Sequence, residues 1–154
     1  MKTRAYVKDL KDKMSESELR KYISSHSCIT IINHWSTICC YQRLSEDFIR
    51  EFKDKVVWKE ICCYQDLSED FIREFQDKVD WKVISERQKL SEAFIREFQD
   101  KVSWKNISWS YTFGVLENKL SEDFIREFKD KDAFLLSWGE LLLPRESLEA
   151  IGEL

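Results

Sequence analysis

Adjacent cysteines are the residues in this sequence whose types and spacing most suggest chemistry. Cys39 and Cys40 form one pair, Cys62 and Cys63 form a second, and Cys28 stands alone. Zinc holds thiolates at about 2.3 Å. The two pairs occupy equivalent places in a repeat, and stacked helices lie about 8 to 10 Å apart, so one ion could hardly gather both pairs. We therefore expect the cysteines to pack as small side chains in a reducing compartment, with no metal or other cofactor.

A second candidate is a series of four tryptophans at one repeat position: Trp35, Trp58, Trp81 and Trp104. Regularly spaced indole rings could stack the bases of single-stranded nucleic acid. Such sites need a positively charged groove, whereas this chain interleaves 25 basic with 29 acidic residues for a net charge of -4. We expect a buried tryptophan ladder and predict no nucleic-acid partner.

Carboxylates and histidines offer little sign of catalysis. Glu46 and Asp47 have counterparts in the other copies of the repeat, whereas an active site is normally single, so these carboxylates are predicted to cap helices and to keep the surface soluble. His26 and His34 have no carboxylate or cysteine partner at ligand spacing. The sequence lacks a glycine-rich phosphate loop, a nucleophile elbow and an H-E-x-x-H motif. We predict a protein that is not an enzyme, with no catalytic, cofactor-binding or metal-binding residue.

These recurring positions belong to a tandem repeat. LSEDFIREF, or LSEAFIREF in one copy, begins at Leu44, Leu67, Leu90 and Leu120; the first two steps are 23 residues and the third is 30. A worn copy lies upstream, because MSESELRKY (14–22) aligns with LSEDFIREF and HWSTICCYQR (34–43) aligns with VWKEICCYQD. Internal repetition of this period indicates a solenoid or a similar repeat architecture.

One copy has the pattern of two short helices. In the copy from Leu67, Phe71, Ile72 and Phe75 share one helical face, and Ser68 is a good N-cap. A second helix follows Asp80 by the same pattern. Each helix is expected to contain about nine residues and to be about 13 Å long. Helices this short are marginal alone, so they must stack on neighbouring copies.

The predicted fold class is therefore all-α, an α-solenoid of helix-turn-helix repeats of about 23 residues. We expect one helical-repeat domain over 1–154: a degenerate N-terminal repeat and cap in 1–43, regular repeats in 44–119, and a last half-repeat with an apolar C-terminal cap in 120–154. No apolar run approaches the roughly 18 residues of a membrane span, and no signal peptide is evident. The protein is expected to be soluble and not secreted.

Departures from the regular repeat are the candidate contact residues. Seven-residue expansions lie within 23–33 and 110–118, and the repeat decays into an apolar tail after Lys131. Such departures often lie on the binding face of a repeat protein. The predicted protein-binding residues are four in the second expansion and three in the tail: Tyr111, Phe113, Val115, Leu116, Trp138, Leu141 and Leu142.

The phrase LSEDFIREFQDKVDWKVIS closely resembles the short tandem repeats of large protein families in giant nucleocytoplasmic large DNA viruses. The resemblance covers about 44–134 closely and 14–43 weakly. It implies a virus-encoded, non-enzymatic protein that binds other proteins, as a structural or minor capsid component, located in the virion or the host cytoplasm. The family supplies no catalytic residues to carry over, and the oligomeric state stays open.

A shorter segment supports an alternative. LPRESLEAIGEL (143–154) resembles the opening of an F-box, L-P-x-E-x-L-x-x-I, through which substrate adaptors dock onto ubiquitin ligases. The matching residues are Leu143, Pro144, Glu146, Leu148 and Ile151. This resemblance implies a host-directed adaptor. The match is well short of a full F-box, and a terminal helix that begins near the proline is the plainer interpretation.

Overall fold

The computed structural model describes residues 13–25, 34–112 and 120–128, except the side chains of Tyr111 and Thr112. The regular secondary structure of this part is entirely helical, which confirms the predicted all-α helical-repeat fold. The chain divides into two compact units, Met1–Asp80 and Trp81–Leu154, here called the N-terminal and C-terminal units. Each is described by itself, and a single domain over 1–154 stays a prediction.

Each copy contributes a first and a second helix. The first helices are α2 (Glu16–Ser25), α5 (Glu46–Glu51), α7 (Glu69–Glu74), α9 (Glu92–Glu97) and α11 (Glu122–Glu127). The second helices are α4 (Trp35–Tyr41), α6 (Trp58–Tyr64), α8 (Trp81–Arg87) and α10 (Trp104–Thr112). The helix starts recur every 23 residues from α5 to α10, which is the step of the repeat in the sequence. The worn copy upstream likewise contributes a first helix, α2, and a second helix, α4.

Serine caps set where the first helices begin. The hydroxyl oxygen of each N-cap accepts the backbone N–H three residues later at 3.1 to 3.2 Å, at Ser45, Ser68, Ser91 and Ser121. Acidic residues follow in the first turn, where the helix dipole favours them. The capping role predicted for Ser68 is confirmed.

Most helices are shorter than the predicted nine residues: the first helices of the regular copies contain six residues, and α6 and α8 contain seven, whereas α10 contains nine and α2 ten. Phe75 leaves the helical conformation with φ −112 and ψ 28, and the N–H groups of Lys78 and Val79 both bond to its carbonyl. This turn buries Val79 outside the helix. The position of Val79 in the sequence suggested a longer helix, because a tight turn after Phe75 and a further helical turn would both place this valine in the core.

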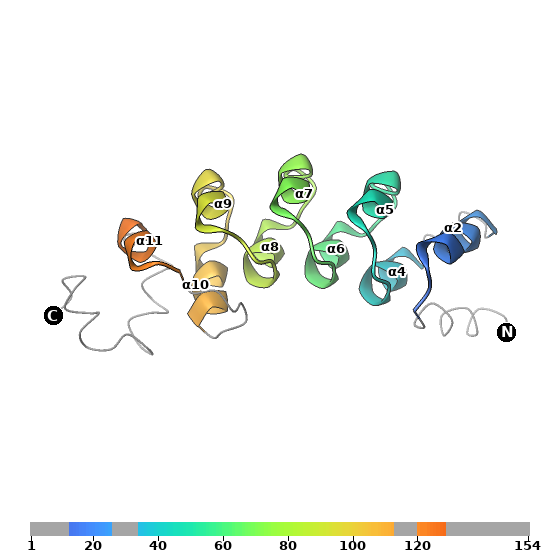
Figure 1. Ribbon diagram of the computed structural model, residues 1–154, viewed down its shortest axis with the longest axis horizontal. Helices are drawn as coiled ribbons and strands as arrows, with labels where there is room; N and C mark the ends of the chain where they lie inside the picture. Colours follow the sequence, from blue (N-terminus) through green and yellow to red (C-terminus); the bar gives the residue numbers. More distant parts are fainter. Residues whose placement is uncertain (1–12, 26–33, 113–119, 129–154) are drawn as a thin grey trace. The chain divides into compact units, whose positions relative to one another are not determined.

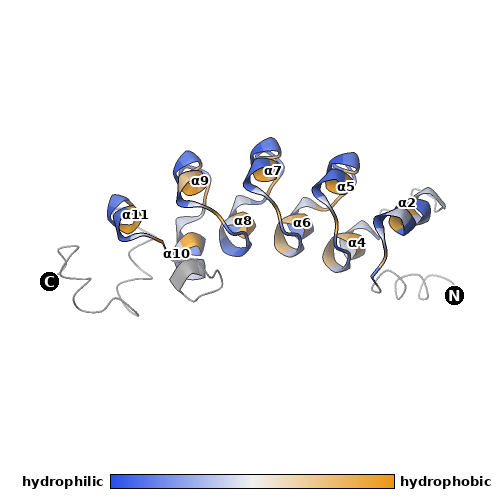
Figure 2. Cartoon of the chain, in the orientation of Figure 1, coloured by the Kyte–Doolittle hydropathy of each residue, from blue (hydrophilic) through white to orange (hydrophobic). Residues whose placement is uncertain are grey.

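Within each unit the first helices form one row and the second helices form another (Figure 1). The polar residues lie on the outer rims, and apolar residues face the space between the rows (Figure 2). Phe48, Ile49 and Ile61 are fully buried in the N-terminal unit, as are Phe94 and Ile107 in the C-terminal unit. Burial of such side chains contributes about 1.5 to 3 kcal/mol each, so packing between helices supplies the stability that short helices lack.

The worn N-terminal copy uses a different polar contact. His34 is buried at the start of α4, and its Nδ1 lies 2.7 Å from the hydroxyl oxygen of Tyr22 in α2. Leu19 takes the place that Ile49 has in the regular copy and is fully buried. The imidazole of His34 therefore joins the two helices of its copy.

Candidate protein-binding surface

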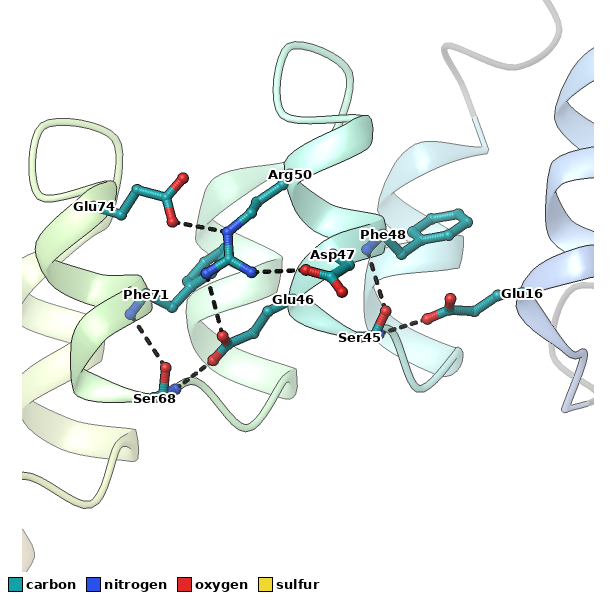
Figure 3. A network of polar contacts seen from close by, with 9 residues as sticks. All are labelled: Glu16, Ser45, Glu46, Asp47, Phe48, Arg50, Ser68, Phe71 and Glu74. Carbon is teal, nitrogen blue, oxygen red and sulfur yellow. Dashed lines mark hydrogen bonds and ion pairs between the residues drawn. The ribbon is translucent and has the colours of Figure 1, made fainter.

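A ladder of carboxylates joins successive first helices. Within each unit, the glutamate that begins a first helix accepts the backbone N–H of the serine N-cap of the next first helix, with N···O distances of 2.5 to 2.7 Å, in the pairs Glu16–Ser45, Glu46–Ser68 and Glu92–Ser121. Figure 3 shows the first two of these bonds. A serine oxygen thus caps its own helix while the serine N–H is capped by the helix before it. The carboxylates predicted to serve capping and solubility also connect the copies.

Arginine side chains make a second set of contacts between successive first helices. Arg50 Nε donates to Glu74 in the next first helix at 2.8 Å, and Nη1 contacts Asp47 in its own helix at 3.0 Å (Figure 3). Its guanidinium also lies 5.0 Å from the centroid of the Phe71 ring. The hydrogen bond to Glu74 raises the pKa of Arg50 above its ordinary value. Arg20 and Arg96 make the same contacts with the glutamate and phenylalanine of their next helices.

A buried glutamine connects the copies on the other side. Gln65 Nε2 donates to the backbone carbonyls of Cys39 and Gln42, both at 2.8 Å, and its Oε1 accepts the N–H of Leu44 at 2.9 Å. Gln42 accepts the N–H of Met14 at 2.8 Å in the same way. Sequence reasoning missed these residues, although Gln42, Gln65 and Gln88 recur at one repeat position, which was a visible signal.

Cys39 and Cys62 are hydrogen-bond acceptors in the packing. The Sγ of Cys62 accepts the N–H of Asp80 at 3.4 Å, and Ser85 at the equivalent position accepts the N–H of Ser103 through Oγ at 2.9 Å. Burial raises the pKa of both Cys39 and Cys62 to about 11. A thiol that stays protonated at neutral pH is a poor nucleophile and a poor metal ligand. The position requires a small side chain, as expected, and also an acceptor atom.

The tryptophans pack against pairs of phenylalanines. The ring centroid of Trp58 lies 4.9 Å from that of Phe75 and 6.3 Å from that of Phe71 in the next first helix, and its indole N–H donates to the carbonyl of Lys53 at 3.0 Å. Trp35 is buried, but Trp58, Trp81 and Trp104 are only half-buried. The tryptophans therefore contact phenylalanines as part of the packing, but three of the four rings are partly exposed, whereas a buried ladder was expected. Lys78 Nζ lies over the Trp58 ring, 5.9 Å from its centroid.

The second helices carry the side chains that differ among copies. The position of Tyr64 holds Tyr41, Arg87 and Ser110 in the other copies, and the preceding position holds Cys40, Cys63, Glu86 and Trp109. Ser110 is fully buried and donates to the carbonyl of Glu86 at 2.9 Å, so we call the other seven residues the variable positions. Three of them are large apolar side chains that are exposed: Tyr41 at 52%, Tyr64 at 58% and Trp109 at 44%.

The variable positions of the N-terminal unit have a shared environment. α4 and α6 contact each other, and the Sγ of Cys40 donates to a carboxylate oxygen of Glu60 at 3.2 Å across them. Burial raises the pKa of Cys40 to about 11, and the Glu60 carboxylate is the second cause of this increase. Negative charge on Cys63, Cys40 and Glu60 would oppose ionisation of Tyr64 and raises its pKa. Both groups are therefore neutral at physiological pH and present an aromatic, thiol-lined surface.

Tyr111 is the one predicted contact residue that lies in the described part of the chain. Tyr111 lies in the last turn of α10, a helix two residues longer than α8, as an expansion at this point would produce. Phe113, Val115, Leu116, Trp138, Leu141 and Leu142 lie outside the described residues, as do Cys28, His26 and the F-box-like segment 143–154. Their role in binding stays a prediction.

Comparisons with known proteins add no further assignment. The sequence matches no protein-family model, and neither a curated protein nor a solved structure is detectably similar to it. Among the described residues, no three histidine, cysteine or carboxylate side chains are grouped as metal ligands. None of the helices in 13–25, 34–112 and 120–128 combines the length and apolar character that crossing a bilayer requires.

Proposed function

We propose that this chain is a non-enzymatic helical-repeat protein that binds another protein through the variable positions of its second helices. One observation carries the proposal: the side chains that join the copies are nearly constant, whereas the exposed side chains of the second helices change from copy to copy. A repeat protein keeps its framework constant and uses an extended exposed surface for binding. The changes at the variable positions are what a specific partner would recognise.

The N-terminal unit indicates the chemistry of that partner. Tyr41 and Tyr64 occupy equivalent positions on the packed helices α4 and α6, so their backbones lie about 8 to 10 Å apart. Exposed tyrosines supply large contact area with a hydrogen-bonding tip and are enriched in binding hot spots. A partner segment with apolar side chains and with hydrogen-bonding groups for the hydroxyls would fit this pair.

Three features support a role other than catalysis. The repeated carboxylates are engaged in the ladder, the buried thiols have raised pKa values, and the polar side chains with unusual contacts join helices. The resemblance to repeats of giant viruses further supports a virus-encoded protein that serves as a structural or minor capsid component. Mass spectrometry of purified particles tests this assignment: stoichiometric amounts of the chain support it, and absence from the particles contradicts it.

Photo-crosslinking tests the surface itself. The full chain carries p-benzoylphenylalanine in place of Tyr64 or of Tyr41. A matched variant carries it in place of Asp70, whose side chain is 93% exposed on a first helix. We expect one dominant crosslinked partner from position 64 and from position 41, and much weaker crosslinking from position 70. Equal crosslinking at all three positions would remove the variable positions from the binding surface.

The adaptor alternative depends on the match of 143–154 to an F-box opening. A pull-down of the ubiquitin-ligase linker protein by the full chain is compared with that by a chain that ends at Glu140. Loss of capture on truncation supports the adaptor, whereas equal capture or none leaves it without support.

A further inference from the structure

Two exposed tyrosines lie at the same repeat position on neighbouring second helices. Tyr41 is the last residue of α4, and Tyr64 is the last residue of α6. Because α4 and α6 pack against each other, the two positions are separated, as packed helices are, by about 8 to 10 Å. The same position holds Arg87 in α8 and Ser110 in α10, so the tyrosine pair distinguishes the N-terminal unit from the C-terminal unit.

The face of α6 that carries Tyr64 is turned toward α4. Glu60 and Tyr64 are four residues apart in α6, so they are neighbours on its surface. The thiol of Cys40 in α4 donates to the Glu60 carboxylate at 3.2 Å. Charge on four groups would raise the pKa of Tyr64: Cys63, Cys40, Glu60 and Tyr41. Because such effects weaken with distance, the two tyrosines line one surface with a carboxylate beside them.

The separation of the tyrosines favours one backbone conformation in a bound segment. A polyproline II helix has about three residues per turn and rises about 3.1 Å per residue, so side chains at i and i+3 lie about 9 Å apart on one face. An extended strand repeats a face at about 7 Å and again at about 13 Å. An α-helix repeats a face at about 6 Å and, two turns on, at about 10.5 Å. Of the three, the polyproline II repeat falls within the range of about 8 to 10 Å.

The chemistry of the surface also fits such a segment. A polyproline II backbone has no internal hydrogen bonds, so its carbonyl groups are open to donors. The tyrosine hydroxyls can donate to these carbonyls while the rings contact proline side chains, and aromatic surfaces recur as the docking sites of proline-rich segments. Glu60, which is half-buried beside Tyr64, supplies a negative charge for a basic residue that flanks the prolines.

We propose that Tyr41 and Tyr64 dock a proline-rich segment of a partner protein in the polyproline II conformation. Prolines at i and i+3, in the pattern P-x-x-P, contact the two rings, and a basic residue next to them pairs with Glu60. This proposal rests on the proposed function, binding through the variable positions, and it names the chemical class of the partner. The C-terminal unit has Arg87 at this position and does not dock such a segment.

A synthetic peptide serves as the probe. It contains twelve prolines followed by one arginine and carries fluorescein at its N-terminus. The full chain is titrated into the peptide, and binding is followed by fluorescence anisotropy. We expect saturable binding. A peptide of the same length that alternates glycine with serine before the arginine should bind at least about tenfold more weakly, because a flexible peptide loses more conformational entropy.

Three substitutions locate the site. Tyr41→Ser and Tyr64→Ser should each weaken binding by at least about tenfold, as the loss of an aromatic anchor does. Serine already stands at this position in α10, so the fold should persist, and circular dichroism checks that it does. The matched control Arg87→Ser, at the same position of α8, should leave binding unchanged.

Glu60→Gln tests the charge. The amide retains an oxygen that can accept the Cys40 thiol. Binding of the arginine-ended peptide should weaken by about two- to fivefold, as the loss of an exposed ion pair does. Binding of a peptide of twelve prolines without the arginine should not change. Equal weakening for both peptides contradicts the role given to Glu60.

Other results overturn the proposal. Absence of saturable binding contradicts it, as does equal binding of the glycine–serine peptide or equal binding by the Tyr64→Ser variant. The partner crosslinked from position 64 separates this failure from failure of the proposed function. A dominant partner whose crosslinked segment lacks proline contradicts the polyproline II segment but supports binding through the variable positions, whereas a proline-rich crosslinked segment supports both.

Discussion

Replacement of Gln65 by alanine should be the most damaging single change in the polar framework. The amide makes three hydrogen bonds, to the carbonyls of Cys39 and Gln42 and from the N–H of Leu44, and it is buried. A net hydrogen bond contributes about 1 kcal/mol, and a buried group left unsatisfied costs about 1 to 3 kcal/mol. We therefore expect the free energy of unfolding to fall by about 2 to 4 kcal/mol.

Urea denaturation followed by circular dichroism measures this loss. With a slope of about 2 kcal/mol per molar urea, the midpoint should fall by roughly 1 to 2 M. Gln99→Ala is the matched control, because this glutamine is exposed and its backbone carbonyl, which accepts the Trp104 indole, is retained. A midpoint for Gln65→Ala equal to that of the control would refute the role given to the buried amide.

A second substitution separates the donors from the acceptor. Gln65→Glu keeps an oxygen for the Leu44 N–H but places a carboxylate against the carbonyls of Cys39 and Gln42. Protonation allows the new side chain to donate one bond, so this variant should be less stable at pH 7 than at pH 4 relative to wild type. Equal destabilisation at both values of pH would contradict this geometry.

Three further predictions follow from the described contacts. Cys62→Ser should change stability by less than about 1 kcal/mol in urea, because Ser85 fills the equivalent position, whereas Cys62→Val should cost more by leaving the Asp80 N–H without its acceptor. Iodoacetamide should alkylate Cys39 and Cys62 of the folded chain slowly at pH 7.5 and faster as pH approaches about 11, as peptide mass spectrometry can measure; rapid labelling at pH 7.5 would contradict their raised pKa values. The hydrogen bonds from Ser15 lower the pKa of the Glu18 carboxyl, so the ionised carboxylate stabilises the fold above the ordinary pKa of 4.5, and this stabilisation is lost as pH falls through the lowered value. Glu18→Gln should therefore reduce the fall in melting temperature at acid pH. An unchanged dependence of melting temperature on pH would contradict this.

The repeat made the fold predictable from sequence. Ser68 followed by acidic residues marked the helix start, and the step of 23 residues transferred this assignment to each regular copy. The helix ends were less predictable, because Val79 returns to the core through a turn after Phe75 and thus imitates a further helical position. The spacing of apolar residues in a sequence does not distinguish a further helical turn from a tight turn that buries the same position.

The contacts between copies were not predicted from the sequence, although the recurring glutamines marked one of the positions involved. The sequence places Glu46 in the first turn of its own helix, where it would interact with the helix dipole. Its carboxylate also accepts the N–H of Ser68 in the next copy. Gln65 recurs with Gln42 at a position that looks polar and solvated, and its burial depends on carbonyls contributed by an earlier copy. These contacts depend on how successive copies are rotated relative to one another, and the sequence of a single copy does not specify this rotation.

The dependence of each copy on its neighbours is tested most directly by circular dichroism of a peptide that spans one copy, residues 67–89. The isolated peptide should have little helix and no cooperative melting, while the full chain has both, because helices of six and seven residues are stabilised by junctions that the peptide lacks. A peptide that is strongly helical and melts cooperatively would contradict the account.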